Sequence, residues 1–213
     1  MLSDAHLSPR KAPGQQRSAR TVDRIVNAAI TVFDDVGYGA ATTNEIAREA
    51  RVSIGSLYQY FPNKDALLVE IARRHVASAV AAFDALIADL GPQADLNIAI
   101  GMVIDLLVGL HERDRLHLLI AHEAPRTAEL EHELLTARQH MVDGAARLLK
   151  GQVPDRQDRL IAAQLVVAVL DAAVHDVILR QPPGQLRDRC VELTKAAVVG
   201  LTGAGGPAGD VLM

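Results

Sequence analysis

The segment at residues 54–61 carries hydrogen-bonding side chains where a helix of a protein core would carry apolar ones. Its two apolar anchors, Leu57 and Phe61, lie four residues apart and share one helix face. The other faces carry glycine, hydroxyl and amide groups, at Gly55, Ser56, Tyr58, Gln59 and Tyr60. Amides and hydroxyls can bind base edges in the DNA major groove, where a glutamine pairs with adenine through two hydrogen bonds. The pattern therefore indicates the recognition helix of a helix-turn-helix.

The preceding residues encode the helix and the turn that must hold this segment. Residues 42–45 fit a capping box, in which the Thr42 hydroxyl caps a helix and the Glu45 carboxylate reaches back to it. Residues 51–53 make the turn, with Ser53 as the N-cap of the recognition helix. Pro62 ends that helix. We therefore expect two short helices joined by a tight turn.

A longer helix is expected on each side of this pair. Residues 21–36 carry a one-sided apolar stripe, formed by Ile25, Ala28, Ala29, Val32, Phe33 and Val36. Gly37 is expected to end that helix as a C-cap glycine. Residues 65–90 form the next long helix, which Gly91 and Pro92 break. Residues 1–20 are polar and basic, and we expect a flexible arm that is either a free terminus or an arm that touches DNA.

The rest of the chain predicts five further helical segments, at residues 95–112, 113–123, 127–150, 155–181 and 185–203. Prolines and glycines separate the later ones, and no strand pattern competes. The expected fold is therefore all-α with nine helices. We expect a helix-turn-helix domain at residues 21–66, a helical body at 67–203 and a disordered tail at 204–213.

Composition and charge agree with a soluble helical protein. Hydrophobic residues make up 49% of the 213 residues and aromatic residues only 3%, which favours helices over an all-β fold. The net charge of −4 by itself argues against a nucleic-acid partner. Residues 1–75, however, hold ten Lys/Arg against eight Asp/Glu, whereas residues 76–213 hold twelve against eighteen. The helix-turn-helix thus lies in the basic part, and an acidic body would be held away from phosphates.

Several other classes of protein are disfavoured. Cys190 is the single cysteine, so a disulfide within one chain is impossible and a reducing, cytoplasmic setting is expected. The longest strongly apolar run, residues 165–170, is too short to span a membrane, and residues 1–20 lack the apolar core of a signal peptide. No nucleophile-elbow, phosphate-binding, dinucleotide-binding or zinc-protease motif is present, so no enzyme is expected. His117 and His122 lie five residues apart and share no helix face, so neither a metal site nor a cofactor is expected.

Residues 21–71 resemble the DNA-binding domain of TetR-family (tetracycline-repressor-like) transcriptional regulators. The motifs that carry this resemblance are IVNAAITVFDDVGY, T-x-x-E-I-A, V-S-x-G-S-L-Y-x-Y-F and N-K-D-A-L-L. They cover about a quarter of the chain, and the remaining helices match the family in number, length and order. Arg51 departs from the pattern, because the family usually has glycine at this point of the turn. A positive φ there would cost an arginine about 1 kcal/mol, and the side chain either contacts a phosphate or is merely solvated.

The resemblance implies two sets of DNA contacts. The phosphate contacts would come from Thr43, Ser53, Tyr60 and Lys64. The base contacts would come from Asn44, Ile54, Gly55, Ser56, Tyr58 and Gln59. Three of the latter have alternatives: Tyr58 can pack half-buried against the first helix, Gln59 can be solvated, and Asn44 can support its helix start.

The body would supply a dimer surface and a ligand pocket. By resemblance, the last two helices form the surface of a homodimer. Residues 160–179 are apolar nearly all round, more than one chain's core needs, although burial within the same subunit is the alternative. The middle helices would enclose a small-molecule effector, with candidate lining residues Met102, Leu106, His117, His122, His140 and Met141. Each histidine taken alone has a surface or core role as its alternative. Gly101 and Gly109 within a helix indicate a close approach or a cavity.

The residues and the resemblance together predict a ligand-responsive, homodimeric repressor that binds a palindromic double-stranded DNA operator and is released by an unknown small molecule. Two alternatives stay open: an interaction module that kept the fold without binding DNA, and a transcriptional activator. The joint presence of the four phosphate-directed residues favours a DNA reader over the interaction module.

Overall fold

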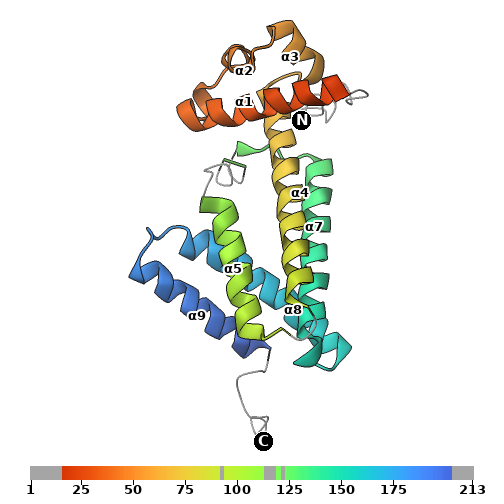
Figure 1. The fold of residues 1–213 in the computed structure, drawn as a ribbon, viewed down its shortest axis with the longest axis vertical. Coiled ribbons are helices and arrows are strands. Elements are labelled where there is room, and N and C mark those ends of the chain that lie inside the picture. The colour runs from red at the N-terminus through yellow and green to blue at the C-terminus, as the bar shows by residue number, and fades with distance from the viewer. Residues whose placement is uncertain (1–15, 92–93, 113–118, 121–122, 203–213) are drawn as a thin grey trace, which may run out of the picture. The chain divides into compact units, whose positions relative to one another are not determined.

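The computed structural model describes residues 16–91, 94–112, 119–120 and 123–202. Within these ranges the chain forms eight α-helices and no strand, so the expected all-α fold is confirmed (Figure 1). The expected helix at residues 113–123 and the tail at 204–213 fall largely or wholly outside the described residues. The chain divides into two compact units. Unit 1 comprises Met1–Ser78 and Asp114–Leu135, and unit 2 comprises Ala79–Arg113 and Thr136–Met213.

Unit 1 contains the helix-turn-helix. Figure 1 shows α1 (Gln16–Ala40) lying along α2 (Thr43–Glu49) and α3 (Ile54–Tyr60), after which α4 (Lys64–Leu90) begins. Residues 16–20, which were expected in the flexible arm, are helical. The regular path of α1 is interrupted at Gly37, where the expected break occurs with a φ of 79°. Glycine adopts this left-handed conformation without the Cβ clash of other residues.

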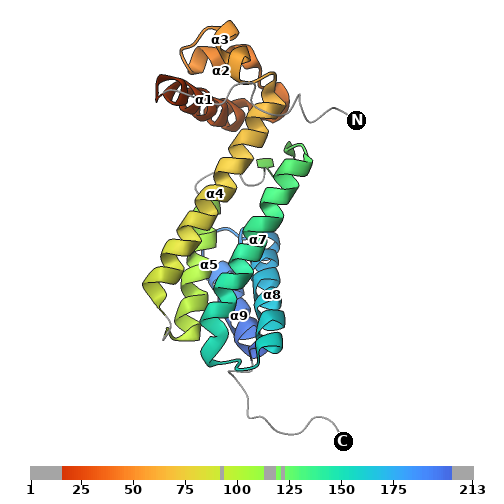
Figure 2. The same ribbon diagram turned by 90° about the vertical axis from the view of Figure 1, so that its right-hand side faces the viewer.

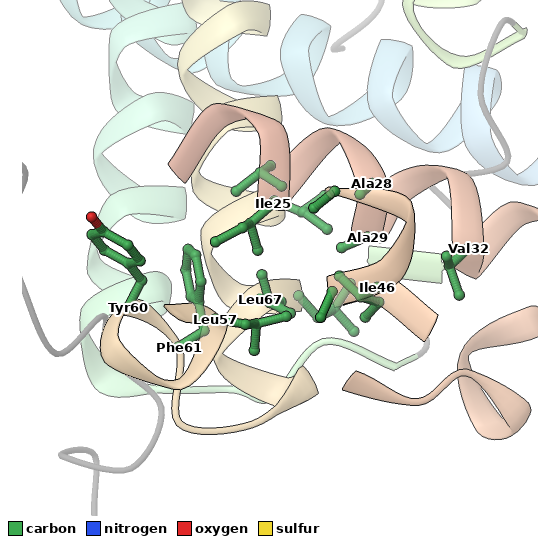
Figure 3. Packing of buried hydrophobic residues seen from close by; sticks show 14 of the residues in the cluster. Ile25, Ala28, Ala29, Val32, Ile46, Leu57, Tyr60, Phe61 and Leu67 are labelled. Carbon is green, nitrogen blue, oxygen red and sulfur yellow. The ribbon is translucent and has the colours of Figure 1, made fainter. Parts of the chain in front are cut away.

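The core of unit 1 is built on the predicted stripe of α1. Ile25, Ala29 and Phe33 are buried there, together with Leu57 and Phe61 of the recognition helix segment (Figure 3). The prediction for Val36 was wrong: this side chain is 49% exposed. Val36 directly precedes the interruption at Gly37, so the stripe ends one turn earlier than its period suggests.

Two consecutive arginines of α4 form ion pairs within unit 1. The Arg73 guanidinium donates to both carboxylate oxygens of Glu133, with Nη2 2.7 Å from Oε1, at the start of α7 (Ala128–Leu148). The Arg74 guanidinium lies 2.9 Å from Asp23 on α1 and 2.8 Å from Glu70 on its own helix. Unit 1 is therefore more than the expected domain at residues 21–66, because α4 up to Ser78 and the start of α7 belong to it.

Unit 2 is a bundle of α5 (Leu96–Glu112), α8 (Arg156–Ala172), α9 (Gln185–Leu201) and the later parts of α4 and α7 (Figure 2). A short 3₁₀ turn, Leu149–Gly151, follows α7, and α8 continues as a π-helical turn, Ala173–Ile178. The buried centre includes Ile104, Val142, Val166, Ile178 and Val198.

Two glycines allow helices of unit 2 to approach closely. A Cβ on Gly101 would lie 3.3 Å from Cε of Lys195 on α9, so the predicted close approach is confirmed at this position. A Cβ on Gly144 of α7 would lie 2.5 Å from Cε1 of Phe83 on α4, which only glycine permits. Gly109 meets no atom within 4 Å and faces open space.

The continuous helix Arg156–Ile178 is long and apolar enough, by length and composition alone, to cross a membrane. The sequence expectation overlooked this, because it considered only the uninterrupted apolar run at residues 165–170. The most apolar 18-residue window has a mean hydropathy of 1.8, and 33% of it is buried within the chain. Helices of soluble proteins that bury an apolar face pass the same test.

Candidate nucleic-acid interface

The N-terminus of α2 is fixed by the predicted capping box. The Thr42 hydroxyl accepts the Glu45 amide over 3.3 Å, and Oε2 of Glu45 accepts the Thr42 amide over 2.9 Å and its hydroxyl over 2.8 Å. These hydrogen bonds from Thr42 lower the pKa of Glu45 below its ordinary value. The capping box thereby holds Thr43 and Asn44 in the first turn of α2, with Asn44 exposed and Thr43 half-buried.

The turn after α2 is a Schellman motif with arginine in the usual glycine position. The Val52 amide donates to the Ala47 carbonyl over 3.0 Å, and the Arg51 amide donates to the Arg48 carbonyl over 3.1 Å. Arg51 has a φ of 55°, the only positive value at a non-glycine residue within the described ranges. This conformation costs an ordinary L-residue about 1 kcal/mol. The backbone at Arg51 is therefore left-handed, the conformation that glycine adopts most readily.

The recognition helix α3 is anchored on one face and exposed on the others. Leu57 is fully buried, whereas Ile54 is 37% and Tyr58 41% exposed (Figure 3 shows the buried side). Gly55 and Gln59 are exposed as well, and Ser56 is half-buried. Ser53 caps the helix as predicted, because its hydroxyl accepts the Ser56 amide over 3.0 Å.

Tyr58 connects the recognition helix to the start of α2. Its hydroxyl lies 3.0 Å from the Thr43 hydroxyl, and either group can be the donor. Tyr58 is 41% exposed and is not among the side chains that pack against the core of unit 1, and its polar end meets α2. One hydroxyl proton of the pair is left for a further acceptor, because the bond between them uses only one.

Tyr60 lies differently from the other residues of the expected phosphate set. Its side chain is buried (Figure 3). Its hydroxyl is 2.8 Å from Oγ of Ser18 on α1. Tyr60 is three residues after Leu57, so it lies on the anchored side of α3. Sequence reasoning missed Ser18, which lies in the segment expected to be a flexible arm.

Lys64 is bound to residues 38–41, which follow the interruption of α1 at Gly37 and lead into α2. Its ammonium donates to the carbonyls of Tyr38, Gly39 and Ala41 over 2.7, 3.2 and 3.3 Å. The same Nζ lies 4.6 Å from the centroid of the Tyr38 ring, a cation–π contact. A lysine has three N–H donors, and these carbonyls engage all three. A phosphate contact of Lys64 stays a prediction, and it requires the ammonium to share these donors.

Tyr38 is also bound from its polar end. Its hydroxyl donates to the carboxylate of Asp65, the residue after Lys64. Burial, and then the hydrogen bond and charge of Asp65, raise the pKa of the Tyr38 phenol. The first two residues of α4 therefore hold Tyr38 at both its backbone carbonyl and its hydroxyl. No sequence motif indicated this arrangement.

The described members of the expected pocket set differ in their surroundings. Met102 of α5 is exposed, whereas Leu106 and Met141 pack partly buried against the core of unit 2. Nε2 of His140 lies 2.7 Å from a carboxylate oxygen of Asp84. Two further members, His117 and His122, lie outside the described residues. The described residues contain no cluster of potential metal ligands. The ligand pocket stays a prediction.

The helix-turn-helix segment matches a known protein family. Residues 25–71 match the family model for bacterial regulatory proteins of the tetR family. The A-factor receptor protein of Streptomyces griseus is 47% identical over 53 residues, which are 25% of this chain and only 19% of that protein. The high identity thus extends over a quarter of this chain and less than a fifth of that relative.

Similarity over most of the chain is weaker. The fatty acid metabolism regulator protein of Bacillus subtilis is 23% identical over 158 residues, 71% of this chain and 80% of that protein. The crystal structure of the transcriptional regulator FadR from Bacillus subtilis, in complex with stearoyl-CoA, has a TM-score of 0.59 at 19% identity. That match covers 87% of this chain and 99% of the other. This chain therefore shares the fold of that regulator over most of its length.

Proposed function

Because this chain belongs to the TetR family of bacterial transcriptional regulators, we propose that it is a cytoplasmic, ligand-responsive repressor. In this proposal a homodimer binds a palindromic DNA operator and leaves it when a small molecule binds the helical body. The proposal rests on α3, which is buried on one side and exposed on the other. Leu57 is fully buried, while Ile54, Tyr58 and Gln59 are exposed on a helix that a capped turn holds rigidly. Such a helix fits the major groove with its exposed side chains against base edges.

The phosphate contacts would come from hydroxyl groups at two helix N-termini. The Ser53 hydroxyl accepts the Ser56 amide and keeps its own proton to donate to a phosphate. The Thr43 hydroxyl, paired with Tyr58, lies in the first turn of α2, where the helix dipole favours an anion. Tyr60 and Lys64 would mainly position the neighbouring elements, since their polar groups bind Ser18 and residues 38–41.

The dimer would form through α8 and α9. Along α8, Ile161 and Leu165 are exposed although both are large and apolar, and along α9 Leu186, Leu193 and Leu201 are exposed. Ile161 and Leu165 are one turn apart, and the three α9 leucines are spaced at seven and eight residues, so each set follows one helix face. Contact with a second copy of the chain would bury these apolar side chains, as the interface of a homodimer requires.

Effector control would act through α4, which continues without interruption from unit 1 into unit 2. Its N-terminal end contacts residues 38–41 through Lys64, and Arg74 binds Asp23 on α1. A ligand that moves α4 would therefore act on the helix-turn-helix directly. To change operator occupancy decisively, the ligand must prefer the released state by several kcal/mol, of the order of 5. Long-chain acyl-CoA is the first effector to test, because a similarly folded regulator binds stearoyl-CoA.

The test is a fluorescence-anisotropy titration of the full chain with DNA from immediately upstream of its gene, over a series of salt concentrations. We expect tight, salt-sensitive binding that competitor DNA of mixed sequence does not displace. Stearoyl-CoA, and then other small molecules, are added to the complex. Weak binding of equal strength to this fragment and to every other genomic fragment would contradict sequence-specific DNA binding. A bound, saturating ligand that leaves DNA affinity unchanged would contradict the coupling through α4.

A further inference from the structure

The turn between α2 and α3 retains a conformational strain that a glycine would remove. Arg51 has a φ of 55° and occupies the C′ position of a complete Schellman motif, for which glycine is the usual residue. The motif itself needs only the backbone of this residue, because both hydrogen bonds use main-chain groups. The side chain of Arg51 therefore adds nothing to the turn that offsets its strain.

The guanidinium of Arg51 also lacks a partner among the described residues. Arg51 is exposed, and no described residue forms a hydrogen bond or ion pair with its side chain. Arg48, three residues earlier, is exposed too and is the basic residue in the last turn of α2. Two cationic side chains thus lie at this turn, and among the described residues the side chain of the strained one, Arg51, has no partner that accounts for its presence. Strain that persists without an internal compensation is a reason to look for an external ligand.

The position of Arg51 defines what that ligand would be. It precedes by two residues Ser53, whose hydroxyl caps α3 and belongs to the expected phosphate set. An arginine side chain extends about as far as two residues of backbone, so its guanidinium can reach the phosphates next to the Ser53 site. We propose that Arg51 is an additional DNA-phosphate ligand, which grips the backbone beside the entry of α3 into the major groove. This proposal rests on the proposed DNA-binding function.

Arginine is the side chain suited to this task. Its planar guanidinium can donate two parallel hydrogen bonds to one phosphate, and it stays charged at all relevant pH values. A contact of this kind releases one counterion and therefore steepens the salt dependence of binding. It carries no sequence information, so it strengthens binding to any duplex alike.

Three variants of the full chain separate charge from strain. Arg51→Gln removes the charge and keeps a side chain in the strained conformation, Arg51→Gly removes both, and Arg51→Lys keeps the charge. The control is Arg138→Gln, an equal loss of charge at an exposed position of α7 in unit 2. The probe is a labelled duplex of mixed sequence, about 30 base pairs long, titrated at several salt concentrations.

We expect Arg51→Gln and Arg51→Gly each to weaken binding roughly fivefold to tenfold per protomer at 0.1 M salt and to lower the salt slope by about one. Arg51→Lys should keep the slope, and Arg138→Gln should change neither quantity. Arg51→Gly should at the same time raise Tm by about 2–4 °C, because it relieves the turn.

Three results would overturn the proposal. These are wild-type affinity and slope in both Arg51→Gln and Arg51→Gly, a loss in Arg51→Gly alone, or an equal loss in Arg138→Gln. The last would mean that overall charge, and not this turn, determines binding. The proposed function fails in a different way, since the wild-type chain itself would then show no salt-sensitive binding to DNA.

Discussion

The ammonium of Lys64 donates a hydrogen bond to the backbone carbonyl of Tyr38 over 2.7 Å and lies 4.6 Å from the centroid of the same residue's ring. Asp65 accepts the hydrogen bond of the Tyr38 hydroxyl, so the first turn of α4 holds this tyrosine at two points. Thr42 and Thr43 directly follow residues 38–41, which Lys64 binds. The placement of the α2 N-terminus therefore depends on residues of α4, which is the helix expected to move.

We predict that Lys64→Ala lowers both stability and DNA affinity. Three carbonyls lose their shared donor, which should reduce the free energy of unfolding by about 1–2 kcal/mol. Affinity should fall for all duplexes alike, and the salt slope should fall by about one if Lys64 also attracts a phosphate. Chemical denaturation and a salt series of anisotropy titrations measure the two effects. Lys64→Arg is the control that keeps the charge, and an Ala variant with unchanged stability would disprove the role of Lys64 in holding residues 38–41.

The capping box predicts a loss of stability in acid. The Thr42 hydrogen bonds lower the pKa of Glu45 in the folded state below its ordinary value of 4.5. The folded state then binds fewer protons than the unfolded state near that pH, so the stabilisation is fully present above about pH 4.5 and is lost as the pH falls through the folded pKa. Denaturation of the wild type and of Glu45→Gln should differ at pH 7 and converge in acid. A difference independent of pH would exclude the carboxylate as the cause.

Gln59 tests whether α3 reads bases. The side chain is exposed on α3, and an amide can bind adenine through two hydrogen bonds. We expect Gln59→Ala to change the preferred operator sequence, with discrimination at one base pair reduced by about 1–3 kcal/mol. Selection of bound fragments from a random duplex library, compared between variant and wild type, measures this. If the variant merely binds every sequence more weakly by one factor, Gln59 is not a base reader.

The dimer surface is tested by placing a charge on it. Leu165 of α8 is 46% exposed and Leu193 of α9 is 54% exposed, so neither is needed to fill the core of its own chain. Leu165→Glu and Leu193→Glu should each give a folded monomer in analytical ultracentrifugation, because a buried carboxylate opposes the apolar contact. Leu135→Glu, at an exposed leucine of α7, is the matched control and should remain dimeric. Dimers in both interface variants would place the interface elsewhere.

We expect a side chain at Gly144 to lower the stability of unit 2. A Cβ at this position would lie 2.5 Å from Cε1 and 2.9 Å from Cζ of Phe83, so Gly144→Ala should destabilise the fold by about 1–3 kcal/mol. Gly109→Ala is the control, since nothing lies within 4 Å of its Cβ, and it should stabilise the helix by up to about 1 kcal/mol. Both are read from thermal or chemical unfolding. Equal effects at the two glycines would mean that helix propensity alone determines them.

The local signals in the sequence were sufficient for the elements of the helix-turn-helix. The capping box at Thr42, the cap at Ser53 and the break at Gly37 each depend on residues close in sequence, and all three occur as predicted. Tyr60 could have been placed on the anchored side from its spacing to Leu57, but the family motif suggested a phosphate contact instead. Its helical period is the better guide to its burial.

Long-range contacts had no comparable signal. The binding of Lys64 to residues 38–41 joins groups more than 20 residues apart, and nothing in the type of either partner specifies it. The approach of Phe83 to Gly144 is of the same kind, because an isolated helical glycine does not reveal its neighbour. The π-helical turn Ala173–Ile178 also lies within a pattern that reads as an ordinary helix.

Unit 1 is assembled from two separate stretches of the chain, and this limits how the molecule can be divided. Leu119, Ile120 and Ala124 of the second stretch pack against the same core as α1 and α3. A fragment that stops after Ser78 would expose the apolar surface that these residues cover. Unit 1 therefore cannot be moved to another protein as one continuous N-terminal fragment. During translation it can complete its folding only after all of α5 has been synthesised.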